Sequence, residues 1–207
     1  MSQSAVSGAH WARGRTFYDG LSIDSTNLGG VDQEGYEREF EDVNPTTGAI
    51  RTPNRVRCRL MRNISGIAAL PKRAVSHHAG ANWGKRFDGY TDVLADKLFA
   101  GVVDEHLPSA GCPVNDICWV VVYGPTLVLT DLASLTSAIN IGDAICAGTA
   151  ATSEATTAGR VVPVTMTQGG TTGQTALDMA INYIGRALSA RTTDNTNADL
   201  LCFVGRY

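Results

Sequence analysis

Residues 118–124 read CWVVVYG, and residues 126–132 read TLVLTDL after an intervening proline, Pro125. An uncharged run rich in β-branched and aromatic residues predicts a strand. Because an unbroken apolar run is typical of a strand covered on both faces, we expect 118–124 to lie deep in the core. Pro125 lacks a backbone N–H, so it predicts the end of that strand and the start of a second one at 126–132.

A second pattern, upstream, predicts a half-buried hairpin. Segments 37–42 (EREFED) and 55–60 (RVRCRL) each alternate with a period of two, which is the mark of a strand with one exposed face. The intervening segment 44–48 contains Asn, Pro and Gly, which favour a turn. An antiparallel hairpin would set two charged rows opposite each other: Glu37, Glu39 and Glu41 on one strand, and Arg55, Arg57 and Arg59 on the other.

The rest of the chain adds further short apolar runs separated by turn residues. The chain has 207 residues, of which 43% are hydrophobic and only 18% charged. Regularly spaced short strands predict a mainly β protein, a β-sandwich or β-barrel (jelly-roll-like) body over residues 36–207. We expect further strands at 67–70, 98–104, 143–147, 161–166 and 199–207, a loop at 77–89, and either a helix or a strand within 176–190.

Residues 1–35 predict an extended N-terminal arm. The segment is polar and rich in glycine, yet it carries aromatic residues that a floppy tail would lack. The arm is expected either to become ordered against a partner or to fold onto its own body. It has no apolar core of a signal peptide, and no run of the chain is long enough for a membrane span. Candidate interface residues in the arm are Trp11, Arg13, Arg15, Phe17 and Tyr18.

Charge is unevenly distributed along the chain. The formal net charge is -3, yet segment 51–86 contains nine basic residues and no acidic one. The functional interpretation is a basic interface with an acidic partner; the structural one is neutralisation by the Glu row of the hairpin. The acidic overall charge of the chain argues against nucleic acid as the partner. Candidate interface residues here are Arg55, Arg57, Arg59 and Arg62.

No catalytic constellation emerges from the sequence. Nucleophile-elbow, phosphate-loop and dinucleotide-binding motifs are absent, and the adjacent His77 and His78 lack metal-ligand spacing. The cysteines form no CxxC pair and are expected to be buried or free thiols. We therefore expect no enzymatic activity, no metal and no cofactor.

The order of several segments resembles the small head-decoration, or capsid-cement, proteins of tailed phages. The resemblance covers residues 55–207 and runs through RCRLMRNISGIAALPKRAV, LFAGVVDEHLP, NDICWVVVYGPTLVLTD, INIGDAICAG, YIGRALSA and DLLCFVGRY. It implies a β-rich homotrimer on the outer capsid surface of the virion, contacts to the major capsid protein, and no cofactor. It carries no catalytic residues.

Three alternatives stay open at this point. The first is another virion structural protein, such as a minor capsid, head-fibre or tail component. The second is a module that binds carbohydrate or nucleic acid, and the third is an enzyme of an unrecognised kind.

Overall fold

The structure is a computed structural model, which describes residues 13–14, 16–17, 34–91, 98–130, 138–147, 159–164, 183–191 and 198–205. Over these ranges strands dominate, and the helical content is one 3-10 turn, η3 (Gly80–Asn82). The mainly β prediction is confirmed. No helix in the described ranges is long and apolar enough to cross a membrane.

The strands form one 11-stranded sheet that closes on itself at one end. In chain order they are β1 (Thr16–Phe17), β2 (Glu37–Val43), β3 (Ile50–Asn63), β4 (Ala74–His77), β5 (Arg86–Tyr90), β6 (Phe99–Val103), β7 (Ile117–Leu129), β8 (Ala144–Ala147), β9 (Val161–Pro163), β10 (Tyr183–Ala187) and β11 (Asp199–Val204).

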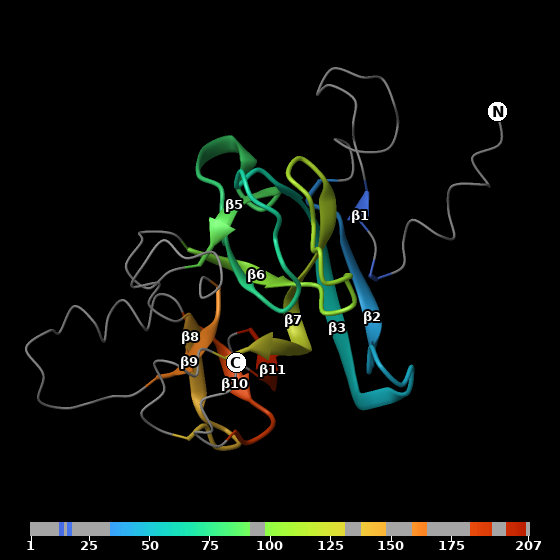
Figure 1. Cartoon of the computed structure of the whole chain (residues 1–207), viewed down its shortest axis with the longest axis vertical. Coiled ribbons are helices and arrows are strands. Elements are labelled where there is room, and N and C mark those ends of the chain that lie inside the picture. The colour runs from blue at the N-terminus through green and yellow to red at the C-terminus, as the bar shows by residue number, and fades with distance from the viewer. Residues whose placement is uncertain are drawn as a thin grey trace, which may run out of the picture.

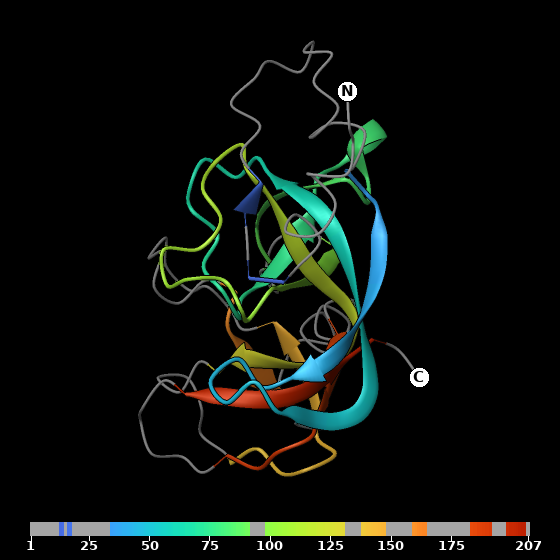
Figure 2. The same cartoon turned by 90° about the vertical axis from the view of Figure 1, so that its right-hand side faces the viewer.

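Strands β3, β5, β4, β6 and β7 make a closed barrel, seen in the upper half of Figure 1. The β3–β5 pair is parallel, and the other four neighbouring pairs are antiparallel. Closure removes free sheet edges from this part of the molecule. Figure 2 shows how the long β3 runs beyond the barrel together with β2.

Strand β7 leaves the barrel and enters a second layer. Past Gly124 it pairs with β11, and the sheet continues through β10 and β8 to the edge strand β9. The predicted strand break at Pro125 is therefore wrong. Pro125 lies opposite Phe203 in the ladder, and Gly124, at φ +103°, allows the chain to turn from one layer to the other without ending the strand.

Two hydrophobic clusters share β3 and β7 as a common wall. Met61, Val75, Phe87, Val103 and Val120, from the five barrel strands, fill the barrel. On the other side of the wall, side chains such as those of Leu60 and Trp119 pack with the second layer. Both faces of 118–121 are thus buried, as the apolar run predicts.

Other sequence expectations have mixed outcomes. The strands at 98–104, 143–147 and 199–207 are confirmed as β6, β8 and β11, and β9 ends on Pro163 at the sheet edge. The strand expected at 67–70 is wrong, because only an isolated bridge joins Ala69 to Cys112 there.

The loop expected at 77–89 is also wrong, since β5 begins at Arg86 and pairs with β3 and β4. The described part of 176–190 is the strand β10, and residues 176–182 lie outside the described ranges.

The described residues of the predicted arm lie against the body. Strand β1 pairs with Ile117 and Cys118 of β7, beyond the point where β6 ends. Gly35 donates a backbone hydrogen bond to the Leu60 carbonyl at 2.7 Å. These contacts correspond to the arm folded onto its own domain.

Candidate binding surface and adjoining pocket

The charged rows of the β2–β3 hairpin face each other in the register that the sequence predicts. The three directly opposed pairs are Glu37 with Arg59, Glu39 with Arg57, and Glu41 with Arg55. The side chains that alternate with the Arg row on β3 are buried, so the Arg row lies on the exposed face. The prediction of a half-buried hairpin is confirmed.

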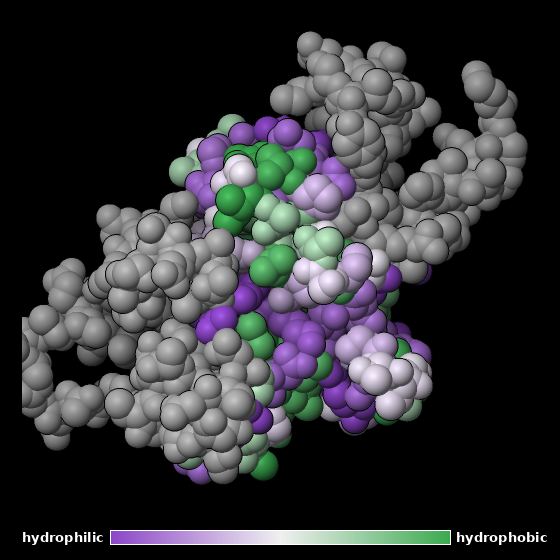
Figure 3. Space-filling view, in the orientation of Figure 1, coloured by the Kyte–Doolittle hydropathy of each residue, from purple (hydrophilic) through white to green (hydrophobic). Residues whose placement is uncertain are grey.

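Ion pairs and an aromatic contact order this face. Arg59 donates from Nε to Glu37 at 2.8 Å, and Arg57 lies 3.9 Å from the same carboxylate. The Arg57 guanidinium also sits 5.4 Å from the Tyr123 ring centroid, a cation–π distance. Exposed pairs of this kind contribute at most about 1 kcal/mol each. The visible end of the hairpin is near neutral in hydropathy, with hydrophilic residues beside it (Figure 3, lower right). We call Glu37, Glu39, Glu41, Arg55, Arg57 and Arg59 the charged ladder.

Arg62 is separate from the charged ladder. Strand alternation turns it to the other face of β3, where it is 5% exposed. It forms an ion pair with Glu34 and donates to the Asn115 carbonyl at 2.6 Å. Glu34 also accepts from Arg86 at 2.8 Å. Arg62 therefore holds the end of the predicted arm to the barrel.

Arg13, another candidate from the arm, is also engaged within the chain. Its Nε donates to Asp104 at 2.9 Å, and the Gly14 amide donates to the other oxygen of that carboxylate at 2.7 Å. Arg51 continues the network by binding Asp42 at 2.6 Å and Glu105 at 2.8 Å. Burial alone would lower the pKa of Arg13, but the neighbouring carboxylates raise it above its ordinary value.

The remaining arm candidates are only partly described. Phe17 lies in β1 opposite Ile117. Trp11, Arg15 and Tyr18 lie outside the described residues.

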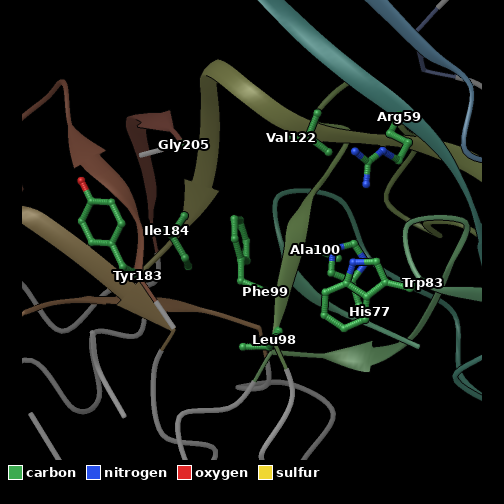
Figure 4. A pocket seen from close by; sticks show the side chains of 10 residues that line it. All are labelled: Arg59, His77, Trp83, Leu98, Phe99, Ala100, Val122, Tyr183, Ile184 and Gly205. Atoms are coloured by element: carbon green, nitrogen blue, oxygen red, sulfur yellow. The ribbon is translucent and has the colours of Figure 1, made fainter. Parts of the chain in front are cut away.

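A pocket of about 340 Å³ adjoins the charged ladder, and Arg59 belongs to both. It opens where the barrel meets β10, so residues from four barrel strands and from the second layer line it. Figure 4 shows Arg59 directed from β3 toward His77 and Trp83, with Phe99 and Ile184 farther across the cavity. The lining residues are Arg59, His77, Trp83, Leu98, Phe99, Ala100, Val122, Tyr183, Ile184 and Gly205.

His77 and Trp83 form a stacked aromatic wall of this pocket. Their ring centroids are 4.3 Å apart with an interplanar angle of 29°. Burial, together with the nearby Arg59 charge, lowers the pKa of His77 to about 4, so the imidazole is neutral at pH 7. Its Nδ1 is buried and has no hydrogen-bond partner within the described ranges.

Sequence reasoning treats His77 and Trp83 as loop residues and misses the pocket. The only local signal is an aromatic residue near a histidine pair. What brings the lining together is pairing over long sequence separations, namely of β4 with β6 and of β3 with β7. His78 does not line the pocket. Its Nδ1 lies 3.5 Å from Oδ2 of Asp88.

The cysteines behave as packing residues. All five are free and buried, as the sequence predicts. Burial raises the pKa of Cys146 to about 12, which keeps its thiol protonated at neutral pH. Within the described ranges, no three His, Cys, Asp or Glu side chains are grouped so that they could hold a metal ion.

Comparisons with known proteins return no match: no family model, no curated protein and no solved structure is similar to this chain.

Proposed function

We propose that this protein is a non-enzymatic structural component of a phage virion, which decorates the outer capsid surface and stabilises the head. In this proposal its partner is the major capsid protein, and the decorating unit is a homotrimer. The proposal rests on the resemblance of segments within 55–207 to capsid-cement proteins.

The observation that carries a surface-binding role is the charged ladder. A ribbon built only for internal stability gains little from exposed ion pairs, because each contributes at most about 1 kcal/mol. Charge patterns of this kind act more strongly in partner choice and register. The β2–β3 ribbon extends past the barrel, as Figure 2 shows, so its exposed face is accessible to a partner.

Its edge position also favours docking by side chains over pairing by strand addition. β2 is the first strand in the sheet order, and it carries four acidic residues and one arginine. Charged residues on an edge strand discourage edge-to-edge pairing with other chains. The ladder is therefore suited to recognise a complementary charge pattern on a capsid surface.

The test separates internal pairing from external contact. Arg57→Glu places a like charge opposite Glu39 and reverses the surface charge, whereas Arg57→Glu with Glu39→Arg restores the internal pair in swapped order. We expect both variants to occupy purified capsids poorly in a sedimentation assay, and we expect both to unfold within about 1 kcal/mol of the parent protein.

Full capsid occupancy by both variants would contradict the docking role of the ladder. Recovery of occupancy by the swapped pair alone would mean that Arg57 acts only inside the sheet. Matched charge reversal at Arg186, which lies exposed on β10, is the control for nonspecific electrostatic effects.

A further inference from the structure

The pocket beside the charged ladder combines features that a ligand site needs. At about 340 Å³ it falls in the range of roughly 300–1,000 Å³ typical of small-molecule sites. Its walls are mainly aromatic and aliphatic, with few polar groups. Such a composition favours a ligand that is mainly apolar, and the few polar groups orient that ligand.

Aromatic side chains in the pocket wall determine which ligand shape would fit. Trp83 is 50% exposed although it stacks on His77, so part of the indole remains open to a ligand. Phe99 and Ile184 supply apolar surface elsewhere in the cavity (Figure 4). A planar ring gains both apolar burial and offset or edge contacts against such walls.

The Arg59 guanidinium defines the polar end of the pocket. Arg59 binds Glu37 through Nε and Nη2, and its third nitrogen, Nη1, lies next to Gly84, where an added Cβ would be only 3.2 Å away. The Nδ1 of His77 is buried, which leaves Arg59 Nη1 as the donor of this wall. A guanidinium N–H is a charged donor, and a carboxylate accepts from it.

We propose that this pocket binds an aromatic ring that carries a carboxylate, with the ring against Trp83 and Phe99 and the carboxylate on Arg59 Nη1. This inference goes beyond the proposed capsid role and does not depend on it. The same chemistry occurs in free aromatic acids and in a protein segment where an acidic residue adjoins an aromatic one.

A series of matched probes tests the chemistry on the full-length protein. Phenylacetate carries ring and charge, phenylacetamide carries the ring alone, and acetate carries the charge alone. We expect phenylacetate to shift the NMR signals of the Trp83 indole and the His77 ring at concentrations at least tenfold lower than either other probe, since the charge-assisted hydrogen bonds require the carboxylate.

Two variants with opposite expected effects locate the carboxylate. Arg59→Gln should weaken phenylacetate binding about tenfold, the size expected for loss of a charge-assisted hydrogen bond. Glu37→Gln should strengthen it, because the Glu37 carboxylate no longer neutralises the guanidinium charge or repels the ligand carboxylate. Glu39→Gln is the matched control, since Glu39 lies opposite Arg57 and outside the pocket, and it should leave the affinity unchanged.

Equal binding of phenylacetate and phenylacetamide would overturn the proposal, as would unchanged phenylacetate affinity in Glu37→Gln and Arg59→Gln. The capped dipeptide N-acetyl-Asp-Phe-amide separates the two sources. Tighter binding of the dipeptide than of phenylacetate supports a protein segment as the ligand, and the reverse supports a free aromatic acid. Capsid occupancy is measured separately with the Arg57 variants, so either proposal can fail alone.

Discussion

Arg59 links the two surfaces described above, because its nitrogen atoms are divided between them. Nε and Nη2 hold Glu37 in the charged ladder, and Nη1 lies at the pocket wall next to Gly84. A lysine could not divide its contacts in this way, since a single ammonium lacks the planar fork of a guanidinium. An anion in the pocket could thus contact Nη1 without displacing Glu37 from Nε and Nη2.

The lowered pKa of His77 predicts how the stability of the protein depends on pH. Its folded-state pKa is about 4, below the ordinary 6.5, because burial and the Arg59 charge disfavour the imidazolium. As the pH falls from 6.5 to 4, the unfolded chain takes up a proton that the folded protein does not bind, so stability is lost across this interval. The whole shift corresponds to about 3 kcal/mol, and the solvent exposure of the ring reduces the expected loss to about 1 kcal/mol.

The measurement compares urea unfolding at pH 7.5 and pH 4.5 in the parent protein and in His77→Gln. The variant should lose about 1 kcal/mol less between these two pH values. His78→Gln, at the neighbouring position paired with Asp88, is the control. Identical pH dependence in the parent protein and His77→Gln would show that His77 titrates normally.

At the scale of elements, Gly124 lies where β7 passes from the barrel to the second layer. It has φ +103°, and a Cβ at this position would lie 2.4 Å from the Arg55 carbonyl oxygen. Alanine would therefore add a steric clash with the backbone to the strain of a positive φ. We expect Gly124→Ala to lower the free energy of unfolding by about 3 kcal/mol or more.

The matched control is Gly48→Ala in the β2–β3 turn. Gly48 has φ +70°, and no atom lies within 4 Å of its added Cβ. This variant should lose only the left-handed backbone preference, about 1 kcal/mol. Equal destabilisation of both variants in denaturant unfolding would mean that close packing at Gly124 contributes nothing.

These strands also show which parts of the fold and of the candidate site could be predicted from the sequence. The alternation in 37–42 and 55–60 specifies which side chains share a face, so the pairs of the charged ladder were predictable. Pro125 misleads local reasoning, because pairing with β11 keeps the strand continuous through a residue that usually ends one. The pocket was not predictable, since Arg59, His77 and Tyr183 meet only through the pairing of distant strands.

At the scale of the whole molecule, two sets of ion pairs tie the N-terminal residues to the body, in addition to the pairing of β1 with β7. Arg13 and Gly14 bind Asp104, and Glu34 binds Arg62 and Arg86. Arg13, Arg62 and the carboxylates they bind are all largely buried. Buried pairs are costly to break because the remaining partner keeps an uncompensated charge.

Deletion of residues 2–30 tests the first attachment while it keeps the second. The truncated chain retains Glu34 and the complete barrel, so we expect it to fold with an unchanged far-UV CD spectrum. Removal of Arg13 leaves Asp104 unpaired, and we expect a loss of about 3 kcal/mol in the free energy of unfolding. Arg13→Ala in the full-length chain should account for most of that loss.

If the truncated chain does not fold while Arg13→Ala is only mildly destabilising, β1 is needed for its backbone pairing with β7. If neither change alters stability, the arm is free to leave the body, and reduced capsid occupancy by the truncated chain would then place its function at the partner surface.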